Sequence, residues 1–577
     1  MAESNVSKVE AIRHSLAHLL ASAVLERDPS ALLGVGPVIE HGFYYDIRLS
    51  KPMSESDMES IESRMRELAS QNLPFDRQEV SADEARKLFA SQPMKLELID
   101  EFAKEEQKLT VYKTGEFLDL CRGGHVNNTS EIADGSWKLD KIAGAYWRGN
   151  EKNEMLTRIY GLAFETKNEL DKHLEMLAEA EKRDHRKLGK ELDLFTFSPL
   201  VGSGLPLFTP KGTIIFNLLN DYVWKLRRER GYMKVDVPHI TKPDLYKTSG
   251  HWDKFSEELF HVSTREGNEY ALKPMNCPHH IQIFARKPVS YREMPIRYAE
   301  TTKVYRDEQS GELSGLSRVL SITQDDAHVF CRHSQMKDEF FKIWDIIEKF
   351  YGRIGFDLRV RLSFHDPKKM ERYLGTPEIW KKAEDSLREI AKERGAVVEE
   401  ALGEAALYGP KVDFMAKDAI GREHQVATIQ LDLNMPTRFS LSCTNESGEK
   451  EGVVMLHAAI MGSIERFMNV LIEHFAGAFP VWLSPVQVAV LPIGEKHVEY
   501  ARRVYDELFA KELRVELWNA NDTLGSKIRR AKLEKIPYYL VIGDKEEADG
   551  NVTVESRDNG KISPKTLDEF VDMLNKI

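Results

Sequence analysis

The chain has 577 residues, of which 30% are charged, and a formal net charge of -12 at pH 7. At about 150 residues a domain, this length predicts roughly three to four domains. The net negative charge argues against a nucleic-acid-binding protein whose surface is basic throughout, although a local basic groove is enough to bind RNA phosphates. No apolar run reaches the length of a membrane span and four scattered cysteines are too few for a disulfide scaffold, so we expect a cytoplasmic protein with no signal peptide and no membrane contact.

The first predicted element is a helix from Ser7 to Glu26, in which apolar residues recur at helical spacing. Its histidines His14 and His18 lie four residues apart and therefore share one face. Such a pair can bind a metal or transfer a proton, but on its own it is more often a partly buried polar edge. Further along, the segment 119–125 (DLCRGGH) contains Asp119, Cys121 and His125. Two histidines, a cysteine and a third histidine form a zinc-binding set by residue type.

A densely charged segment from Phe164 to Leu194 follows, with a helical pattern and few apolar positions. This composition is typical of an exposed connector between domains. Glycines and prolines between residues 202 and 210 then mark the entry into a second domain. We therefore predict four parts, with the boundaries 1–163, 164–194, 195–479 and 480–577.

Two segments rich in β-branched residues, Glu300–Glu308 and Ser317–Cys331, are joined by a Gly/Ser/Glu loop, which predicts a long antiparallel hairpin. The hairpin has more charges than a buried strand tolerates unless they meet a ligand or one another. Arginine forks beside a glutamate suit the phosphates and base of a nucleotide, and a solvated hairpin with cross-strand ion pairs is the alternative. The polar residues of the hairpin are Arg306, Glu308, Arg318, Gln324, Asp325, Asp326 and His328.

Beyond the hairpin, residues 407–414 and 422–433 are predicted strands, with a Gly-Pro turn. Gly462 then precedes a helix with Arg466 on its first turns, and helix N-termini and arginine both favour anions. From Pro480 strands and helices alternate, which predicts a small α/β domain with a mostly parallel sheet.

Several of these segments resemble one family. The hairpin, with YRDE, GLSR and QDDAHVF, resembles motif 2 of class II aminoacyl-tRNA synthetases in the form found in threonyl-tRNA synthetases. GYMKVDVP at 231–238 and HAAIMGSIERF at 457–467 resemble motifs 1 and 3, and NCPHH at 276–280 resembles a further threonyl segment. HSLAH at 14–18 with CRGGH at 121–125 resembles the editing domain shared by threonyl- and alanyl-tRNA synthetases.

This resemblance covers nearly the whole chain and implies a multidomain protein of α/β and α+β domains. The expected domains are an α+β editing domain, a class II catalytic domain built on an antiparallel sheet and a small α/β anticodon-binding domain. We expect the small N-terminal domain common in the family to be absent. The implied activity is ATP-dependent activation of L-threonine and its transfer to tRNA(Thr), by a homodimer that pairs through motif 1.

The resemblance also implies an open zinc site at Cys277, His328 and His457, with one ion in each subunit. Threonine can bring its amino group and hydroxyl to such a metal, whereas valine offers only the amine. A site built around a substrate hydroxyl rejects the analogue without it by roughly 10⁴ to 10⁵, but the one methyl that serine lacks is worth only about 10- to 200-fold. Serine therefore passes the first site. A second site that hydrolyses seryl-tRNA(Thr) is needed, and in the bacterial family this editing is metal-independent.

Further roles follow from the same resemblance. Arg306 is expected at the α-phosphate and the amino-acid carboxylate, Glu308 at the adenine amino group, and Arg318 and Arg466 at the distal phosphates of ATP bound with Mg²⁺. The expected catalytic residues are Arg306, Glu308, Arg318, Gln324, Asp326, Tyr408, Lys411, Gln425, Gln430 and Arg466. The expected editing residues are His14, His18, Asp119, Cys121 and His125. The expected anticodon-binding residues are Asn521, Lys527, Arg530, Lys535 and Glu546.

The sequence also departs from the family pattern. Leu320 and Ile322 stand where motif 2 commonly has Arg and Phe, and the lost aromatic face removes about 1 kcal/mol of stacking on adenine. Ala458 and Glu555 replace arginines, and Gly124 replaces a proline. These changes keep open an alternative function, a synthetase-like RNA-binding regulator with altered catalysis. A metallohydrolase built on the first histidine pair is a more distant alternative, because it leaves most of the chain unexplained.

Overall fold

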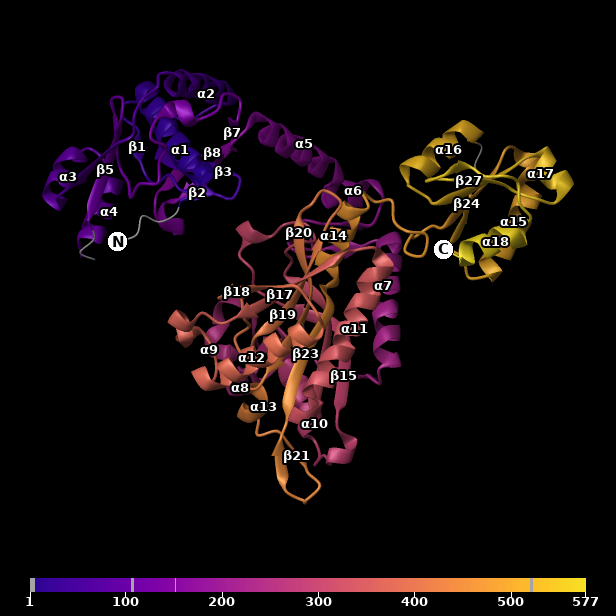
Figure 1. Ribbon diagram of the computed structural model, residues 1–577. Coiled ribbons are helices and arrows are strands. Elements are labelled where there is room, and N and C mark those ends of the chain that lie inside the picture. The colour runs from indigo at the N-terminus through magenta and orange to yellow at the C-terminus, as the bar shows by residue number, and fades with distance from the viewer. Residues whose placement is uncertain (1–5, 105–107, 151, 519–521, 577) are drawn as a thin grey trace. The chain divides into compact units, whose positions relative to one another are not determined.

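The computed structural model describes residues 6–104, 108–150, 152–518 and 522–576 (Figure 1). The chain forms two compact units, Met1–Ala178 and Glu179–Ile577. Among the residues described, no helix is long and apolar enough to cross a membrane.

The first unit is organised around helix α1 (Lys8–Arg27), which confirms the predicted helix at 7–26. Ser7 and Glu10 form a capping box at its start, so the backbone N–H groups of the first turn have acceptors. The helix is buried along most of its length and packs against a sheet of order β1-β3-β8-β7, with β2 beside β3. The elements around α1 are β1 (Leu32–Leu33), β2 (Val38–Ile39), β3 (Gly42–Arg48), α2 (Glu55–Ser70), β7 (Trp137–Tyr146) and β8 (Met155–Ala163).

A second, three-stranded antiparallel sheet completes this unit, in the order β4-β5-β6. Its last strand ends at Leu120, so the segment that carries Cys121 and His125 leaves the sheet as a loop. This loop passes beside α1, where Cys121 contacts His14. The elements are β4 (Asp76–Val80), α3 (Ala82–Leu88), α4 (Pro93–Lys104), β5 (Leu109–Thr114) and β6 (Phe117–Leu120).

The charged segment 164–194, which contains the boundary between the two units at Ala178, is largely helical, as its pattern predicts. Helix α5 (Lys167–Arg183) buries only Leu170 among its residues, which explains why it contains so few apolar side chains. Helix α6 (His185–Glu191) buries His185 and Leu188 and belongs to the second unit.

The second unit contains an eight-stranded sheet in the order β11-β15-β16-β23-β20-β19-β17-β18. All its inner pairs are antiparallel, and only the two edge pairs, β11 with β15 and β17 with β18, are parallel. Helices α7 and α11 run side by side and share one hydrophobic core with the sheet (Figure 1). The strands are β11 (Met233–Lys234), β15 (Ile296–Tyr305), β16 (Ser321–Cys331), β17 (Leu358–Phe364), β18 (Val398–Leu402), β19 (Lys411–Lys417), β20 (Glu423–Asp432) and β23 (Val454–Ser463).

The helices of this unit are α7 (Pro210–Glu229), α8 (Pro243–Ser249), α9 (His251–Lys254), α10 (Cys277–Ala285), α11 (Met336–Ile354), α12 (Pro377–Glu393), α13 (Met435–Arg438) and α14 (Ile464–His474). Short strands outside the large sheet form small antiparallel pairs and a three-stranded sheet. They are β9 (Phe195–Thr196), β10 (Leu207–Phe208), β12 (Ile240–Thr241), β13 (His261–Ser263), β14 (Glu269–Leu272), β21 (Ser442–Thr444) and β22 (Lys450–Gly452).

The predicted hairpin exists, but its strands have other bounds than predicted. Strand β15 begins at Ile296 and ends at Tyr305, so it is displaced toward the N-terminus, and β16 begins at Ser321, four residues later than predicted. Pairing of β15 with β16 ends at Tyr305 and Ser321, so Arg306, Glu308 and Arg318 lie in the connecting loop. The loop closes on itself through a hydrogen bond from the backbone N of Ser314 to the carbonyl of Arg318, which takes these residues out of the strand ladder. The three charged side chains are therefore not strand residues.

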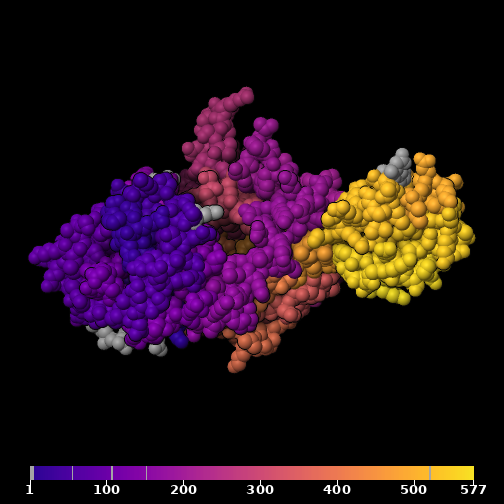
Figure 2. All heavy atoms as spheres, turned by 90° about the horizontal axis from the view of Figure 1, so that it is seen from above, coloured from indigo at the N-terminus to yellow at the C-terminus, as the bar shows by residue number. Residues whose placement is uncertain are grey.

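The carboxyl-terminal part is a five-stranded sheet of order β25-β24-β26-β27-β28. Its first three strands are parallel, as predicted, whereas β27 and β28 add antiparallel pairs that the sequence analysis did not expect. In Figure 2 these last residues, in yellow, form one rounded body. The elements are β24 (Val488–Pro492), α15 (Val498–Ala510), β25 (Val515–Leu517), α16 (Leu524–Leu533), β26 (Tyr538–Ile542), α17 (Asp544–Asp549), β27 (Thr553–Ser556), β28 (Gly560–Lys561) and α18 (Leu567–Asn575).

Candidate functional site

Three residues that lie far apart in the sequence meet at the centre of the large sheet. His328 on β16 and His457 on β23 are direct cross-strand partners, and Cys277 is the first residue of α10. All three are buried, and their ligand atoms lie within 4.8 Å of one another. The sheet register therefore creates a Cys/His/His cluster that sequence spacing alone does not reveal.

The outer nitrogens of both histidines have partners of their own. His457 Nε2 lies 2.9 Å from Asp432 Oδ2, and His328 Nδ1 lies 2.7 Å from His280 Nδ1. The inner nitrogens, His328 Nε2 and His457 Nδ1, are 3.2 Å apart. Burial lowers the pKa of His328 well below its usual range, which keeps its ring in the neutral form that binds a metal. One sulfur and two imidazole nitrogens with fixed outer partners are a donor set that fits zinc and leaves a fourth position open.

A cavity of about 390 Å³ opens on this cluster. Among the residues described, three side chains in its wall have a buried polar atom without a hydrogen-bond partner: His251 Nε2, Arg306 Nε and Gln324 Oε1. Since buried polar groups rarely stay unpaired, these atoms point to a polar ligand. The predicted residues that line the cavity are Cys277, Arg306, Gln324, Asp326, His328, Tyr408, Lys411, Gln430 and His457.

A histidine that was not among the predicted site residues also lines this cavity. His251, at the start of α9, is buried, and its Nδ1 lies 2.7 Å from Ser249 Oγ, while its Nε2 has no partner in the described part of the chain. A lone histidine in a helix carries no spacing signal, so only the fold could reveal it. Gln425, by contrast, does not line the cavity, because its amide donates to Asp413 Oδ1 at 2.8 Å and Thr428 Oγ1 at 3.0 Å.

A second cavity of about 390 Å³ adjoins the first, and Arg306 and Gln324 line both. Arg318 donates to Glu308 Oε2 at 2.6 Å and lies 3.0 Å from Glu312, so the loop charges pair with one another in this structure. Two alternatives were considered for the charges of the hairpin, ion pairs with one another or contacts with a ligand. The structure has both ion pairs and a cavity beside them. The second cavity is lined by Val304, Arg306, Glu308, Ser317, Arg318, Val319, Ile322, Gln324, Gly462, Ser463 and Arg466.

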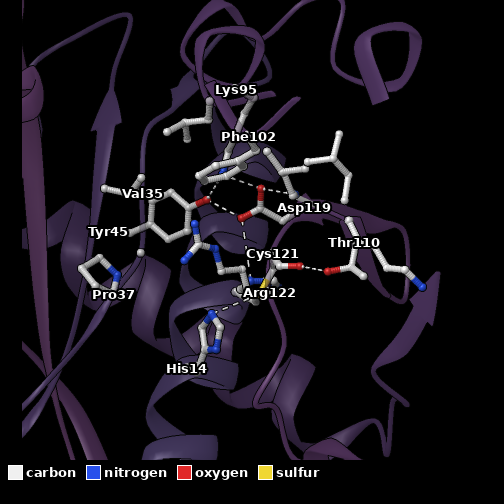
Figure 3. Close-up of a pocket in the computed structure, with 16 residues that line it drawn as sticks. His14, Val35, Pro37, Tyr45, Lys95, Phe102, Thr110, Asp119, Cys121 and Arg122 are labelled. Atoms are coloured by element: carbon white, nitrogen blue, oxygen red, sulfur yellow. Dashed lines mark hydrogen bonds and ion pairs between the residues drawn. The ribbon is translucent and has the colours of Figure 1, made fainter. Parts of the chain in front are cut away.

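The first unit has its own cavity, of about 430 Å³, between α1, α4 and the loop after β6 (Figure 3). Cys121 Sγ lies 3.3 Å from His14 Nε2 and 3.2 Å from His125 Nε2, and His125 Nδ1 lies 3.2 Å from Ser15 Oγ. The two helix histidines, Cys121 and His125 are close enough together to hold a metal ion. Burial raises the pKa of the Cys121 thiol to about 12, so the sulfur is protonated in this environment.

Asp119 belongs to a buried network beside these residues (Figure 3). Its carboxylate lies 2.5 Å from Lys95 Nζ and accepts a 2.5 Å hydrogen bond from the Tyr45 hydroxyl. His18 Nε2 lies 3.8 Å from the same carboxylate. Lys95 and Tyr45 were not among the predicted site residues, because the burial of a lysine on α4 is set by packing and carries no spacing signal.

The predicted anticodon residues have varied surroundings. Lys527 is buried and donates to the carbonyl of Pro492 at 2.8 Å, so its charge lies inside the domain. Arg530 packs over the Trp518 ring at 4.2 Å, and both Lys527 and Arg530 lie on helix α16 and not on a turn. Lys535 is half-buried after that helix, and Glu546 on α17 accepts from the N–H of Gly543. Asn521 lies outside the described residues.

Comparisons with known proteins agree with this geometry. Residues 260–475 match the family model of the tRNA synthetase class II core domain (G, H, P, S and T), and residues 487–577 match the anticodon binding domain. Residues 109–160 match the second additional domain of threonyl and alanyl tRNA synthetases. A chain that combines a large antiparallel sheet with paired cavities, an editing-type domain and an anticodon-binding domain is a class II aminoacyl-tRNA synthetase, and the predicted fold class is confirmed.

Full-length relatives narrow this class. The chain is 49% identical to a threonine–tRNA ligase of Rubrobacter xylanophilus over 95% of its own length and 86% of the relative's, and 46% identical to one of Cytophaga hutchinsonii over 97% and 87%. A crystal structure of the RNA binding domain of a Cryptosporidium parvum threonyl-tRNA synthetase aligns with a TM-score of 0.65 and 40% identity, covering 68% of this chain and 98% of that one. The chain belongs to the threonine–tRNA ligase family.

Proposed function

We propose that this chain activates L-threonine with ATP in the two adjoining cavities of the second unit and transfers it to tRNA(Thr). The observation that supports this most strongly is the position of the Cys277, His328 and His457 cluster in the wall of one cavity, which shares Arg306 and Gln324 with the other. A small amino acid at the cluster would thus have its carboxylate near the same arginine as a nucleotide phosphate.

Amino-acid selection would rest on zinc held by Cys277, His328 and His457. When bound, the ion would offer an open position to the amino and hydroxyl groups of threonine, which valine cannot match. Asp326 lies at the same cavity, 3.7 Å from His328, and its carboxylate would accept from the substrate ammonium group. The hydroxyl of Tyr408 donates to Gln430 of β20 at 2.8 Å, and this bond holds both side chains in the wall of the cavity.

Formation of the adenylate needs no protein nucleophile, so the side chains act by orientation and charge. The second cavity, which shares Arg306 and Gln324 with the first, is called the nucleotide cavity below. Arg306 and Arg466 line it and would bind the phosphates of ATP bound with Mg²⁺, while Glu308 would accept from the adenine amino group. Binding in this way requires Arg318 to exchange its ion pair with Glu308 for the distal phosphates.

The cavity of the first unit would hydrolyse seryl-tRNA(Thr) without a metal. Lys95, Asp119 and Tyr45 would orient the water and the ribose through their shared hydrogen bonds, and His14 lines the same cavity. We further propose a cytoplasmic homodimer that pairs through α7 and β11 and binds the tRNA anticodon with its carboxyl-terminal domain.

The test is amino-acid-dependent exchange of pyrophosphate into ATP, measured with threonine, serine and valine in turn, on the native protein and on Cys277→Ala with zinc content assayed. We expect exchange with threonine, weaker exchange with serine and almost none with valine, and loss of both exchange and zinc in Cys277→Ala. Cys443→Ala is the matched control, because Cys443 is equally buried in the same hydrophobic cluster but lines neither cavity. A folded, zinc-loaded protein without exchange for any of the three amino acids would leave the RNA-binding regulator as the better account.

A further inference from the structure

The sheet contains an irregularity at the border of the nucleotide cavity. Strands β16 and β23 pair as Gln324 with Ser463 and then as Asp326 with Ala459, so one residue of β16 faces three residues of β23. Three consecutive residues, 460–462, therefore leave the strand ladder. Backbone N–H groups that leave a ladder in a buried place need other acceptors.

A single carboxylate accepts all three of these N–H groups. Asp325 is fully buried, and its oxygens lie 3.1 Å from the N of Ile460, 3.2 Å from the N of Met461 and 3.1 Å from the N of Gly462. Arg227 of α7 lies 3.5 Å from the same carboxylate and donates to the backbone carbonyl of Asp325 at 3.1 Å. An ionised carboxylate can accept from several donors at once, whereas an amide would turn an NH₂ group toward some of them.

A second carboxylate makes the reverse connection, from β23 and α14 back to the hairpin. Glu465 is fully buried and accepts from the N of Thr323 at 2.8 Å and from the Thr323 hydroxyl at 2.7 Å. Lys303, the cross-strand partner of Thr323, donates to Glu465 at 2.7 Å. The hairpin thus supplies an acceptor to β23, and α14 supplies an acceptor to the hairpin.

The two carboxylates flank the point where the chain turns from β23 into α14. Gly462 has a φ of +69°, a conformation that favours glycine, and Ser463 caps the helix by accepting from the N of Arg466 at 3.2 Å. Gly462, Ser463 and Arg466 all line the nucleotide cavity. The direction of this turn therefore decides where the Arg466 guanidinium lies relative to Arg306.

We propose that Asp325 and Glu465 are positioning residues for adenylate formation, because together they fix the turn into α14 and hold Arg466 in the same cavity as Arg306. This proposal rests on the proposed use of that cavity for ATP. Neither carboxylate lines the cavity, so each acts through the backbone and not by contact with ATP. A displacement of about 1 Å in such a positioning residue lowers reaction rates by roughly 10²-fold.

The experiment compares Asp325→Asn, Glu465→Gln and the double variant with the native protein. It measures pyrophosphate exchange with ATP and with threonine as the varied substrate, and binding of Mg·ATP by calorimetry without threonine. We expect kcat/KM for ATP to fall by about 10- to 100-fold in each single variant, with a smaller change in KM for threonine. In the double variant, kcat/KM for ATP should be no lower than in the less active of the two single variants, since both residues hold the same turn.

The matched control is Glu339→Gln. Glu339 is as deeply buried as the two carboxylates and accepts from Arg297 at 2.5 Å and 2.7 Å, but it lines neither cavity. If Asp325→Asn and Glu465→Gln only lower the thermal unfolding midpoint as Glu339→Gln does, and leave ATP kinetics and binding unchanged, the proposal is overturned.

Two further results separate the possible failures. A native protein that binds Mg·ATP but shows no exchange would refute the proposed function. In that case the ATP affinities of the variants would still decide whether the two carboxylates are positioning residues. A native protein that does not bind Mg·ATP refutes both proposals. If Asp325→Asn does not fold, Thr323→Val decides together with Glu465→Gln. Thr323→Val removes only the hydroxyl that donates to Glu465, so it should weaken ATP use less than Glu465→Gln does.

Discussion

Replacement of Lys95 by methionine tests whether the buried network of the first unit depends on its charge pair. Lys95 and Asp119 are each 2% exposed, and their charged groups are 2.5 Å apart. Loss of one partner of a buried pair costs about 3–5 kcal/mol, because the other charge stays buried and unpaired. Asp119 keeps hydrogen bonds from the Tyr45 hydroxyl and from the N of Leu120 at 2.8 Å, so we expect the lower end of this range.

About 3 kcal/mol corresponds to a roughly hundredfold larger equilibrium constant for opening of this region. Hydrogen exchange of the full-length chain, read on peptides from α4 and β6, measures this constant directly. Glu101→Gln is the matched control on the same helix, because Glu101 pairs with Arg148 at 2.7 Å with both side chains more than two-fifths exposed. Exposed pairs of this kind contribute only about 0–1 kcal/mol.

The double variant Lys95→Met with Asp119→Asn removes the unpaired charge as well. We expect it to open less readily than Lys95→Met alone, since both members of the pair are then neutral. The reasoning is refuted if Lys95→Met exchanges no faster than Glu101→Gln, or if the second substitution adds its full cost to the first. Deacylation of seryl-tRNA(Thr) should be lost in both Lys95 variants.

Three other outcomes follow from the structure. Ile322→Phe restores an aromatic face to the nucleotide cavity. The dissociation constant of ATP, measured by calorimetry, should therefore fall about fivefold, which corresponds to about 1 kcal/mol of stacking. An unchanged dissociation constant would mean that adenine does not lie against this position. Burial raises the pKa of the Cys121 thiol to about 12, so iodoacetamide should label it at pH 7.5 at least about a hundredfold more slowly than a free thiol. Rapid labelling, detected by mass spectrometry, would contradict the buried geometry. His185 bridges Glu473 Oε1 at 2.7 Å and the N of Leu316 at 3.1 Å. His185→Ala should therefore destabilise the second unit by about 1–3 kcal/mol and raise KM for ATP. An unchanged thermal unfolding midpoint would show that water replaces the bridge.

Several features of this protein are encoded locally and could be predicted from the sequence. The helical spacing and the cap at Ser7 define α1, because the 3.6-residue period and the N-cap are properties of a short segment. The hairpin was predicted from its β-branched segments, but its ends were not, since the loop residues leave the ladder through contacts with one another. Family resemblance added what spacing could not, in particular the expectation that Cys277 belongs with His328 and His457.

The tertiary structure decided the rest, because it sets which distant residues become neighbours. Cys277, His328 and His457 meet only through the register of β16 with β23 and the start of α10. Lys95 lines the cavity of the first unit because α4 packs beside it, and Asp325 is surrounded by N–H groups because the sheet loses its register there. The sequence by itself predicted helix α1, the charged helical segment, the hairpin, the alternating carboxyl-terminal elements and the family. Distances between residues far apart in the chain depend on packing, which no local pattern encodes.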